Sequence, residues 1–321
     1  MSRATRWVYS LVEACDVLRA GGLVAFPTET VYGLGADGLD SSAVRRVFAA
    51  KERPLDNPLI LHVADVESAK AVAVWNAHAA RLAVRHWPGP LTLVLWARPD
   101  VPTEVRGGLR SVAVRCPQHP LAQALIRGFG RPIAAPSANR AGRPSPTTAE
   151  AVWGELAGRI DAVLDGGPCG LGLESTVVDC TGEELRLLRP GAVSAEILGV
   201  SPRPPLGDYR ASPGTRYRHY APAVPLYLVA DVAAVLAQRP GAGLLCTEAC
   251  ARNLGVAAGE RIHIWGADPE RRAAEFYAAL RRLERAPVSC IVAERLPEQG
   301  LDAVIMDRLR RASQSLCAGE E

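Results

Sequence analysis

The chain has 321 residues, which is enough for two domains that each bury a core. It is 48% hydrophobic and 22% charged, and its formal net charge is +3. This is an ordinary globular composition, and the small charge neither requires nor excludes a nucleic-acid partner. The charged N-terminus is neither a signal peptide nor a membrane span, and no later run is apolar enough to cross a bilayer. We therefore expect a cytoplasmic protein without a membrane partner.

The eight cysteines are scattered, and none forms a C-x-x-C pair. Cys246 and Cys250 have helical spacing, but no second pair completes a zinc site. We expect reduced, mostly buried thiols and no metal bound directly by side chains.

Residues 1–200 read as alternating helices and strands. Apolar residues at helical spacing, together with Gly and Pro stops, predict helices over 10–20, 41–51, 77–87, 120–130 and from 147 onward. Ser41 or Ser42 is the expected N-cap of the second helix, and Thr147 with Glu150 has capping-box spacing. Short apolar runs predict strands over 23–26, 58–63, 91–96, 111–116, 132–136, 162–167, 175–180 and 185–191.

Residues 201–225 carry six prolines and no regular periodicity, which predicts a linker. A second β/α alternation follows. Its apolar runs predict strands over 226–230, 243–246, 262–265 and 289–294, with an amphipathic helix over 269–284. We interpret this segment as a small parallel-sheet domain covered by helices.

Polar residues recur in the loops that follow the predicted strands and helices. Lys51-x-Arg53 follows a helix, and Ser137-x-Asn139 follows a strand. Two cations and two neutral hydrogen-bonding groups would suit a phosphorylated ligand, yet a cation at a helix end also complements the helix dipole. No Walker loop is present, so we expect side chains to hold any phosphate.

The remaining candidates are equally ambiguous one by one. Thr28-Glu29-Thr30 follows a strand and could form only a turn. Arg115 ends a strand, where it could bind a carboxylate or make a surface ion pair. His62 could be an ordinary core histidine. No triad surrounds Ser137, so we interpret it as a hydrogen-bonding group. Taken together, the recurrence favours one polar ligand site.

The motifs GGLVAFPTETVYGLGADG, KERPLDNPLILHV, SVAVRCPQHP, PIAAPSANRAGRPSPT and LESTVVD occur in an order that closely resembles the threonylcarbamoyl-AMP synthase, or YrdC-like, family. The resemblance implies a twisted mixed α/β sheet with a concave cleft over residues 1–203. It further implies a linker over 204–225 in the position of an active-site lid, and a smaller Rossmann-like domain over 226–321, as in the longer branch of the family.

The resemblance implies a nucleotidyltransferase that forms L-threonylcarbamoyl-AMP and pyrophosphate from L-threonine, bicarbonate or CO2, and ATP. The signature residues that match the catalytic positions are Lys51, Arg53, Ser137 and Asn139. The positions that match the threonine site are Thr30, His62, Arg115, Ala135 and Ser175. The positions that match the ATP site are Arg53, Asn57, Ser111, Ser137, Ser145, Arg189, His219 and Tyr220. We expect Mg2+ to arrive on the ATP phosphates.

The same resemblance implies a protein partner, the tRNA threonylcarbamoyl transferase, which uses the product to modify the adenosine next to the anticodon. Two alternatives stay open at this point. A basic cleft would bind RNA weakly and nonspecifically, although aromatic stacking signatures are missing. A carbamoyl transferase of the hydrogenase-maturation type is related, but the acylphosphatase and zinc-finger modules of that type are not recognisable in this sequence.

Overall fold

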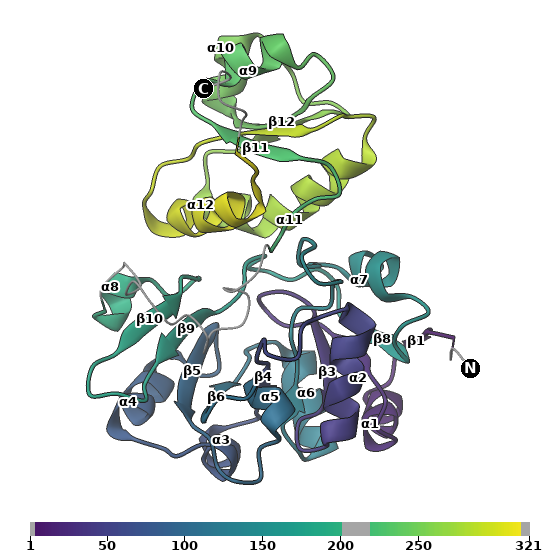
Figure 1. Ribbon diagram of the computed structural model, residues 1–321, viewed down its shortest axis with the longest axis vertical. Helices are drawn as coiled ribbons and strands as arrows, with labels where there is room; N and C mark the ends of the chain where they lie inside the picture. The colour runs from purple at the N-terminus through teal and green to yellow at the C-terminus, as the bar shows by residue number, and fades with distance from the viewer. Residues whose placement is uncertain (1–3, 201–218, 316–321) are drawn as a thin grey trace. The chain divides into compact units, whose positions relative to one another are not determined.

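The computed structural model describes residues 4–200 and 219–315 (Figure 1). The chain divides into two units, Met1–Ala141 with Ser145–Arg216, and Gly142–Pro144 with Tyr217–Glu321. The second unit thus includes three residues from the loop that follows Ser137-x-Asn139. Most of the expected linker, residues 204–218, lies outside the described residues.

The first unit is built on a ten-stranded mixed sheet with the order β1-β8-β2-β3-β7-β4-β6-β5-β9-β10. The central strands β4 and β6 run parallel, and their neighbours β7 and β5 run antiparallel to them. Its strands are β1 (Arg6–Val8), β2 (Val24–Phe26), β3 (Gly33–Asp37), β4 (Ile60–His62), β5 (Leu91–Trp96), β6 (Ser111–Arg115), β7 (Ile133–Ala134), β8 (Ala162–Leu164), β9 (Thr176–Asp179) and β10 (Arg186–Arg189). The expected mixed α/β architecture is confirmed.

Eight helices connect or follow these strands in the described residues. They are α1 (Leu11–Arg19), α2 (Ser41–Lys51), α3 (Val66–Val72), α4 (Ala77–His86), α5 (Thr103–Arg106), α6 (Pro120–Phe129), α7 (Ala149–Leu156) and α8 (Ala195–Leu198). Of these, α1, α2, α4, α6 and α7 lie where they were predicted, and α3, α5 and α8 were not predicted. Two cap predictions were wrong by one or two residues. Asp40 caps α2 and Thr148 caps α7, because in each case it is that side chain that accepts a backbone N–H of the first turn.

The end of α2 directs the chain into the candidate site. Glu52 follows Lys51 in the left-handed conformation (φ 55°), and its N–H bonds back to the carbonyl of Ala49. This cap ends α2 two residues before Pro54, the residue from which the sequence predicted the end of the helix. The side chain of Lys51 is consequently fixed at the last turn of a well-packed helix.

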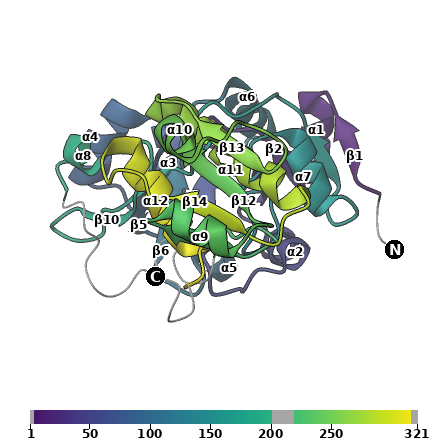
Figure 2. The same cartoon turned by 90° about the horizontal axis from the view of Figure 1, so that it is seen from above.

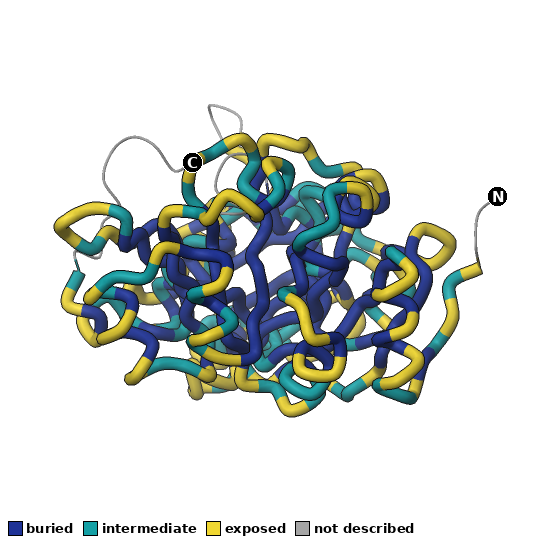
Figure 3. Tube along the Cα trace, turned by 90° about the horizontal axis from the view of Figure 1, so that it is seen from below, coloured by how far each residue is buried: buried dark blue, intermediate teal, exposed yellow. Residues whose placement is uncertain are grey.

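β3 was not predicted, because its sequence GLGAD lacks the β-branched and aromatic residues typical of strands. Close packing explains the glycines. A Cβ added at Gly35 would lie 2.8 Å from both Phe26 and Ile133. β3 therefore passes directly over these side chains and pairs with β2 on one side and with β7 on the other. Figure 3 shows buried residues, in dark blue, in the interior of the trace and exposed residues, in yellow, mostly at its edge.

The second unit has a four-stranded, wholly parallel sheet, as the sequence predicted, and its strand order is β11-β14-β12-β13. Figure 1 shows α9 and α10 on one face of this sheet and α11 and α12 on the other, and Figure 2 shows β12, β13 and β14 side by side. Its elements are β11 (Leu226–Val229), α9 (Val232–Gln238), β12 (Gly243–Thr247), α10 (Glu248–Leu254), β13 (Ile262–Trp265), α11 (Pro269–Arg285), β14 (Ile291–Glu294) and α12 (Gly300–Ala312).

Among the described residues, no helix combines the length and the apolar character that a bilayer span requires. Six of the seven described cysteines are buried, and all seven are free thiols. Burial raises the pKa of the Cys169 and Cys180 thiols to about 12, which keeps both protonated at neutral pH.

Candidate active site

The centre of the candidate site is Arg115, a buried residue at the end of β6. β4 pairs with β6 so that His62 lies opposite Arg115. The guanidinium of Arg115 donates to the hydroxyl of Thr30 at 2.9 Å and to the carbonyl of Gly89 at 3.3 Å, and it lies 2.8 Å from the carboxylate of Glu29. Three of the predicted threonine-site residues are thus together.

The turn after β2 presents Glu29 and Thr30 rigidly. The hydroxyl of Thr28 accepts the N–H groups of Thr30 and Val31, each at 3.2 Å, and lies 2.8 Å from the hydroxyl of Thr30. The carbonyl of Glu29 accepts the N–H of Leu171 at 2.8 Å. The ST-turn expected from sequence is present, but it also fixes two polar side chains beside Arg115.

His62 is a neutral residue in this site. Burial first, and then the nearby Arg115 guanidinium, lower the pKa of His62 to about 3. Its ring meets Phe26 edge-on, with 6.0 Å between the ring centroids. Nδ1 is buried and accepts or donates no hydrogen bond within the described residues. A neutral imidazole with one open nitrogen suits a ligand hydroxyl or amine better than an anion.

We expect His62 to make stability depend on pH. The unfolded chain protonates this ring below about pH 6.5, whereas the folded protein does so only near pH 3. Between these values the unfolded state binds more protons, so the free energy of unfolding falls as pH falls, by up to about 1.4 kcal/mol per pH unit. Urea unfolding of wild type and His62→Asn at pH 7 to 4 tests this. The wild type should lose stability relative to the variant below pH 6.5, and parallel profiles would contradict the assignment.

A second network joins β9, β10 and β5 around Ser175. The guanidinium of Arg189 donates to the carbonyl of Ser175 at 2.9 Å and to its hydroxyl at 3.1 Å. The same hydroxyl lies 2.7 Å from the hydroxyl of Thr92. One predicted ATP-site residue and one predicted threonine-site residue are therefore in direct contact, and Thr92 is a contributor that the sequence did not single out.

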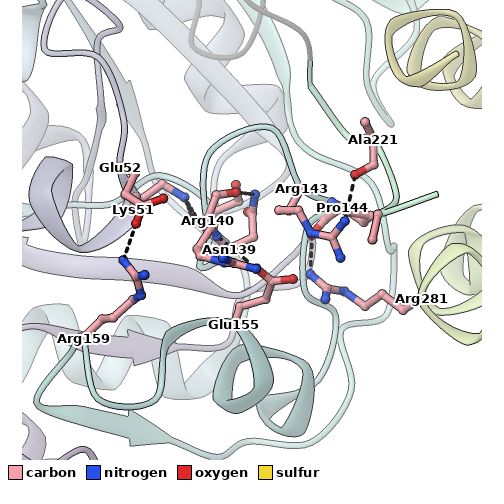
Figure 4. A network of polar contacts seen from close by, with 12 residues as sticks. Lys51, Glu52, Asn139, Arg140, Arg143, Pro144, Glu155, Arg159, Ala221 and Arg281 are labelled. Carbon is pink, nitrogen blue, oxygen red and sulfur yellow. Dashed lines mark hydrogen bonds and ion pairs between the residues drawn. The ribbon is translucent and has the colours of Figure 1, made fainter. Parts of the chain in front are cut away.

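Lys51 holds the loop that carries Ser137 and Asn139 (Figure 4). Its Nζ donates to the backbone carbonyls of both residues, and its own carbonyl accepts the N–H of Ala141 at 2.8 Å. The side chain is 1% exposed. Burial, and then the charge of Arg53, hold the pKa of Lys51 well below that of a free lysine. The K-x-R and S-x-N motifs are thus joined, but through the loop backbone.

Arg53 and Asn57 contact one another. Nη2 of Arg53 donates to the side-chain oxygen of Asn57 at 2.5 Å and to the carbonyl of Pro58 at 3.0 Å. This pair lies just before β4, so Arg53 is ordered and only partly buried. Arg53 is therefore more accessible to solvent than Lys51, which is buried.

The other predicted residues take separate positions. Ser145 donates to the buried carboxylate of Glu174 at 2.6 Å. Ser111 begins β6, about 13 Å along the strand from Arg115 at ~3.3 Å per residue, and Ala135 is buried after β7. His219 and Tyr220 are described with the second unit, where Tyr220 packs against Tyr277 with 5.7 Å between ring centroids.

No group of three His, Cys, Asp or Glu residues in the described parts of the chain could hold a metal ion. The cations and hydroxyls of the candidate site are suited to anionic oxygens. They therefore fit a metal that enters bound to the phosphates of a nucleotide. The fold and the networks together define an α/β protein whose buried polar site suits a small anionic ligand.

The chain belongs to the Sua5/YciO/YrdC family. The family model, described as "Telomere recombination", matches residues 16–191, and a model described as "Threonylcarbamoyl-AMP synthase, C-terminal domain" matches residues 181–314. The threonylcarbamoyl-AMP synthase of Bacillus subtilis is 42% identical over 94% of this chain and 92% of its own length. That of Pyrococcus abyssi is also 42% identical, over 94% and 93%.

The solved structure of P. abyssi Sua5 complexed with L-threonine matches with a TM-score of 0.85 and 40% identity, over 94% of both chains. The structure of Escherichia coli YciO matches with a TM-score of 0.55 and 23% identity, over 60% of this chain and 99% of that one, which supports the fold alone.

Proposed function

We propose that this protein is an L-threonylcarbamoyl-AMP synthase. The amine of L-threonine attacks CO2, derived from bicarbonate, to give a carbamate. A carbamate oxygen then attacks the α-phosphate of ATP, and pyrophosphate leaves. The observation that supports this most is the contact of residues from separate segments around Arg115, in a chain similar to named synthases over 94% of its length.

The amino-acid half of the site is Thr30, His62, Arg115, Ser175 and the backbone of Ala135. In this proposal Arg115 binds the threonine carboxylate through its planar fork of N–H groups. Neutral His62 and the hydroxyls of Thr30 and Ser175 orient the threonine hydroxyl and amine. The contact of Arg189 with Ser175 links this half to the nucleotide half.

The nucleotide half is Arg53, Asn57, Ser111, Ser137, Asn139, Ser145 and Arg189, joined by His219 and Tyr220 from the linker. Arg53 is the cation that we assign to phosphate charge. We assign Lys51 to holding the Ser137–Asn139 loop in shape, because its ammonium group already donates to two backbone carbonyls of that loop. MgATP is the substrate form, with the metal carried by the phosphates.

The protein acts by positioning and by charge stabilisation, and no side chain becomes covalently attached to the substrate. Because carbamates hydrolyse readily, excluding water from the cleft is part of the mechanism. We assign residues 204–225 to this task as a linker that closes over the nucleotide, between a catalytic domain (1–203) and a Rossmann-like domain (226–321).

The product is a reactive intermediate, so we propose that a tRNA threonylcarbamoyl transferase receives it in the cytoplasm. Direct RNA binding, in this proposal, is weak and electrostatic. Salt-sensitive RNA binding without threonine-dependent ATP turnover would favour a nucleic-acid module instead.

Pyrophosphate release measured with each substrate omitted in turn tests the proposal. We expect release that requires ATP, bicarbonate and L-threonine together and that Arg53→Ala reduces by about 100-fold through lost charge stabilisation. An unchanged melting temperature is the control for folding. Release that does not depend on threonine, or near-normal turnover in Arg53→Ala, would contradict the assignment.

A further inference from the structure

Glu29 is a buried carboxylate whose only described partner is Arg115. Its Oε1 lies 2.8 Å from Nη2 of Arg115, and its side chain is 13% exposed. Both carboxylate oxygens are shut off from solvent, yet neither accepts a hydrogen bond within the described residues. A buried carboxylate normally accepts several hydrogen bonds, so a carboxylate with one ion-pair contact and no hydrogen bond requires an explanation.

Two of the three guanidinium nitrogens of Arg115 have acceptors other than Glu29. Nη1 donates to the hydroxyl of Thr30 and Nε to the carbonyl of Gly89, while the buried Nη2 faces Glu29 without a hydrogen bond within the described residues. The side chain of Glu29 is also presented by a turn whose backbone is held by Thr28 and Leu171. Such preorganised placement is typical of groups that meet a ligand.

A cation and an anion side by side match the two charges of an α-amino acid. Arg115 complements the carboxylate of the amino acid, and Glu29 complements its ammonium group, which brings three N–H donors. The ammonium group would supply the donors that the oxygens of Glu29 lack. The chemistry imposes a second demand, because the nitrogen must lose a proton before its lone pair can attack CO2.

We propose that Glu29 binds the ammonium group of the amino-acid substrate and accepts the proton that frees its nitrogen for attack. This rests on the proposed function. The ammonium group gives one proton to the Glu29 carboxylate, which becomes a carboxylic acid. The nitrogen lone pair forms the bond to the carbon of CO2, while one C–O π pair moves onto oxygen. The adduct then loses a second N–H proton to water, leaving a carbamate with one negative charge.

The test is the pH profile of kcat/KM for L-threonine in wild type and Glu29→Gln, using the full chain. The wild type uses the abundant ammonium form, whereas the variant depends on the free amine, whose fraction rises about tenfold per pH unit. We therefore expect the ratio of wild type to variant to fall about 100-fold between pH 6.5 and 8.5. Glu275→Gln removes another Glu–Arg pair, with a 2.7 Å separation, and the ratio of wild type to this variant should stay near one at every pH.

A ratio that stays constant with pH would overturn the proposal and would leave Glu29 as a residue that only holds Arg115. A variant that binds threonine more tightly would also overturn it, because Glu29 would then compete with the substrate carboxylate. Wild-type protein without threonine-dependent turnover would instead refute the proposed function. If the glutamine variant does not fold, calorimetry of threonine binding to the wild type in buffers of different ionisation enthalpy decides. We expect no net proton release, and release of one proton would contradict the transfer to Glu29.

Discussion

Replacing Lys51 by methionine is expected to lower kcat for pyrophosphate release by about 100-fold, because the loop carrying Ser137 and Asn139 loses its anchor. Methionine keeps the apolar stem but removes the N–H groups that bind two loop carbonyls. Each carbonyl left unpaired in the interior costs about 1–3 kcal/mol. Steady-state kinetics, with circular dichroism as the folding control, measure the effect.

Lys70→Met is the matched control, since Lys70 is the only other lysine in the sequence and pairs with Glu67 at the surface. It should retain wild-type kcat. If Lys51→Met also retains it, the loop does not need this anchor, and the motif would have to act through Arg53 alone.

Replacing Arg115 by glutamine is expected to raise KM for threonine by about 100-fold and to destabilise the fold by about 3–5 kcal/mol. The loss of stability follows from Glu29, whose carboxylate would remain buried without its cation. Urea unfolding and threonine titration measure the two effects separately. Arg186→Gln removes an arginine that is 54% exposed and paired with Asp179, so it should cost only about 0–1 kcal/mol.

The double variant Glu29→Gln/Arg115→Gln separates the two causes. Without the buried charge it should recover much of the lost stability, while threonine binding stays weak. A double variant as unstable as Arg115→Gln would show that packing of the arginine, rather than its charge, holds this part of the fold.

The strands and helices with strong apolar patterns could be predicted from sequence, whereas β1 and β3 were not predicted. The apolar run at residues 111–116 predicted β6. The second β/α alternation, after residue 225, predicted the parallel sheet of the second unit. β3 exists because tertiary packing requires glycine over Phe26, which local propensity opposes. The cap of α2 was misplaced because Asp40, Ser41 and Ser42 are all good capping residues and only geometry selects among them.

The candidate site was predicted as a set of residues, but the role of each could not be read from its type. Lys51 stands in a motif that suggests a cation facing phosphate, whereas its ammonium group is buried against backbone carbonyls. Glu29 lies between two threonines in the sequence, but only its ion pair with Arg115 in the structure marks it as a candidate site residue. These contacts join segments about 90 residues apart, and local sequence carries no sign of them.

Mass spectrometry of the reaction with 13C-bicarbonate, ATP, Mg2+ and L-threonine tests the proposed synthase activity most directly. We expect a threonylcarbamoyl-adenylate that is heavier by one 13C atom than the product from unlabelled bicarbonate, and no such product when threonine is omitted. A 13C-labelled adenylate formed without threonine, or ATP hydrolysis with no labelled adenylate, would contradict this assignment.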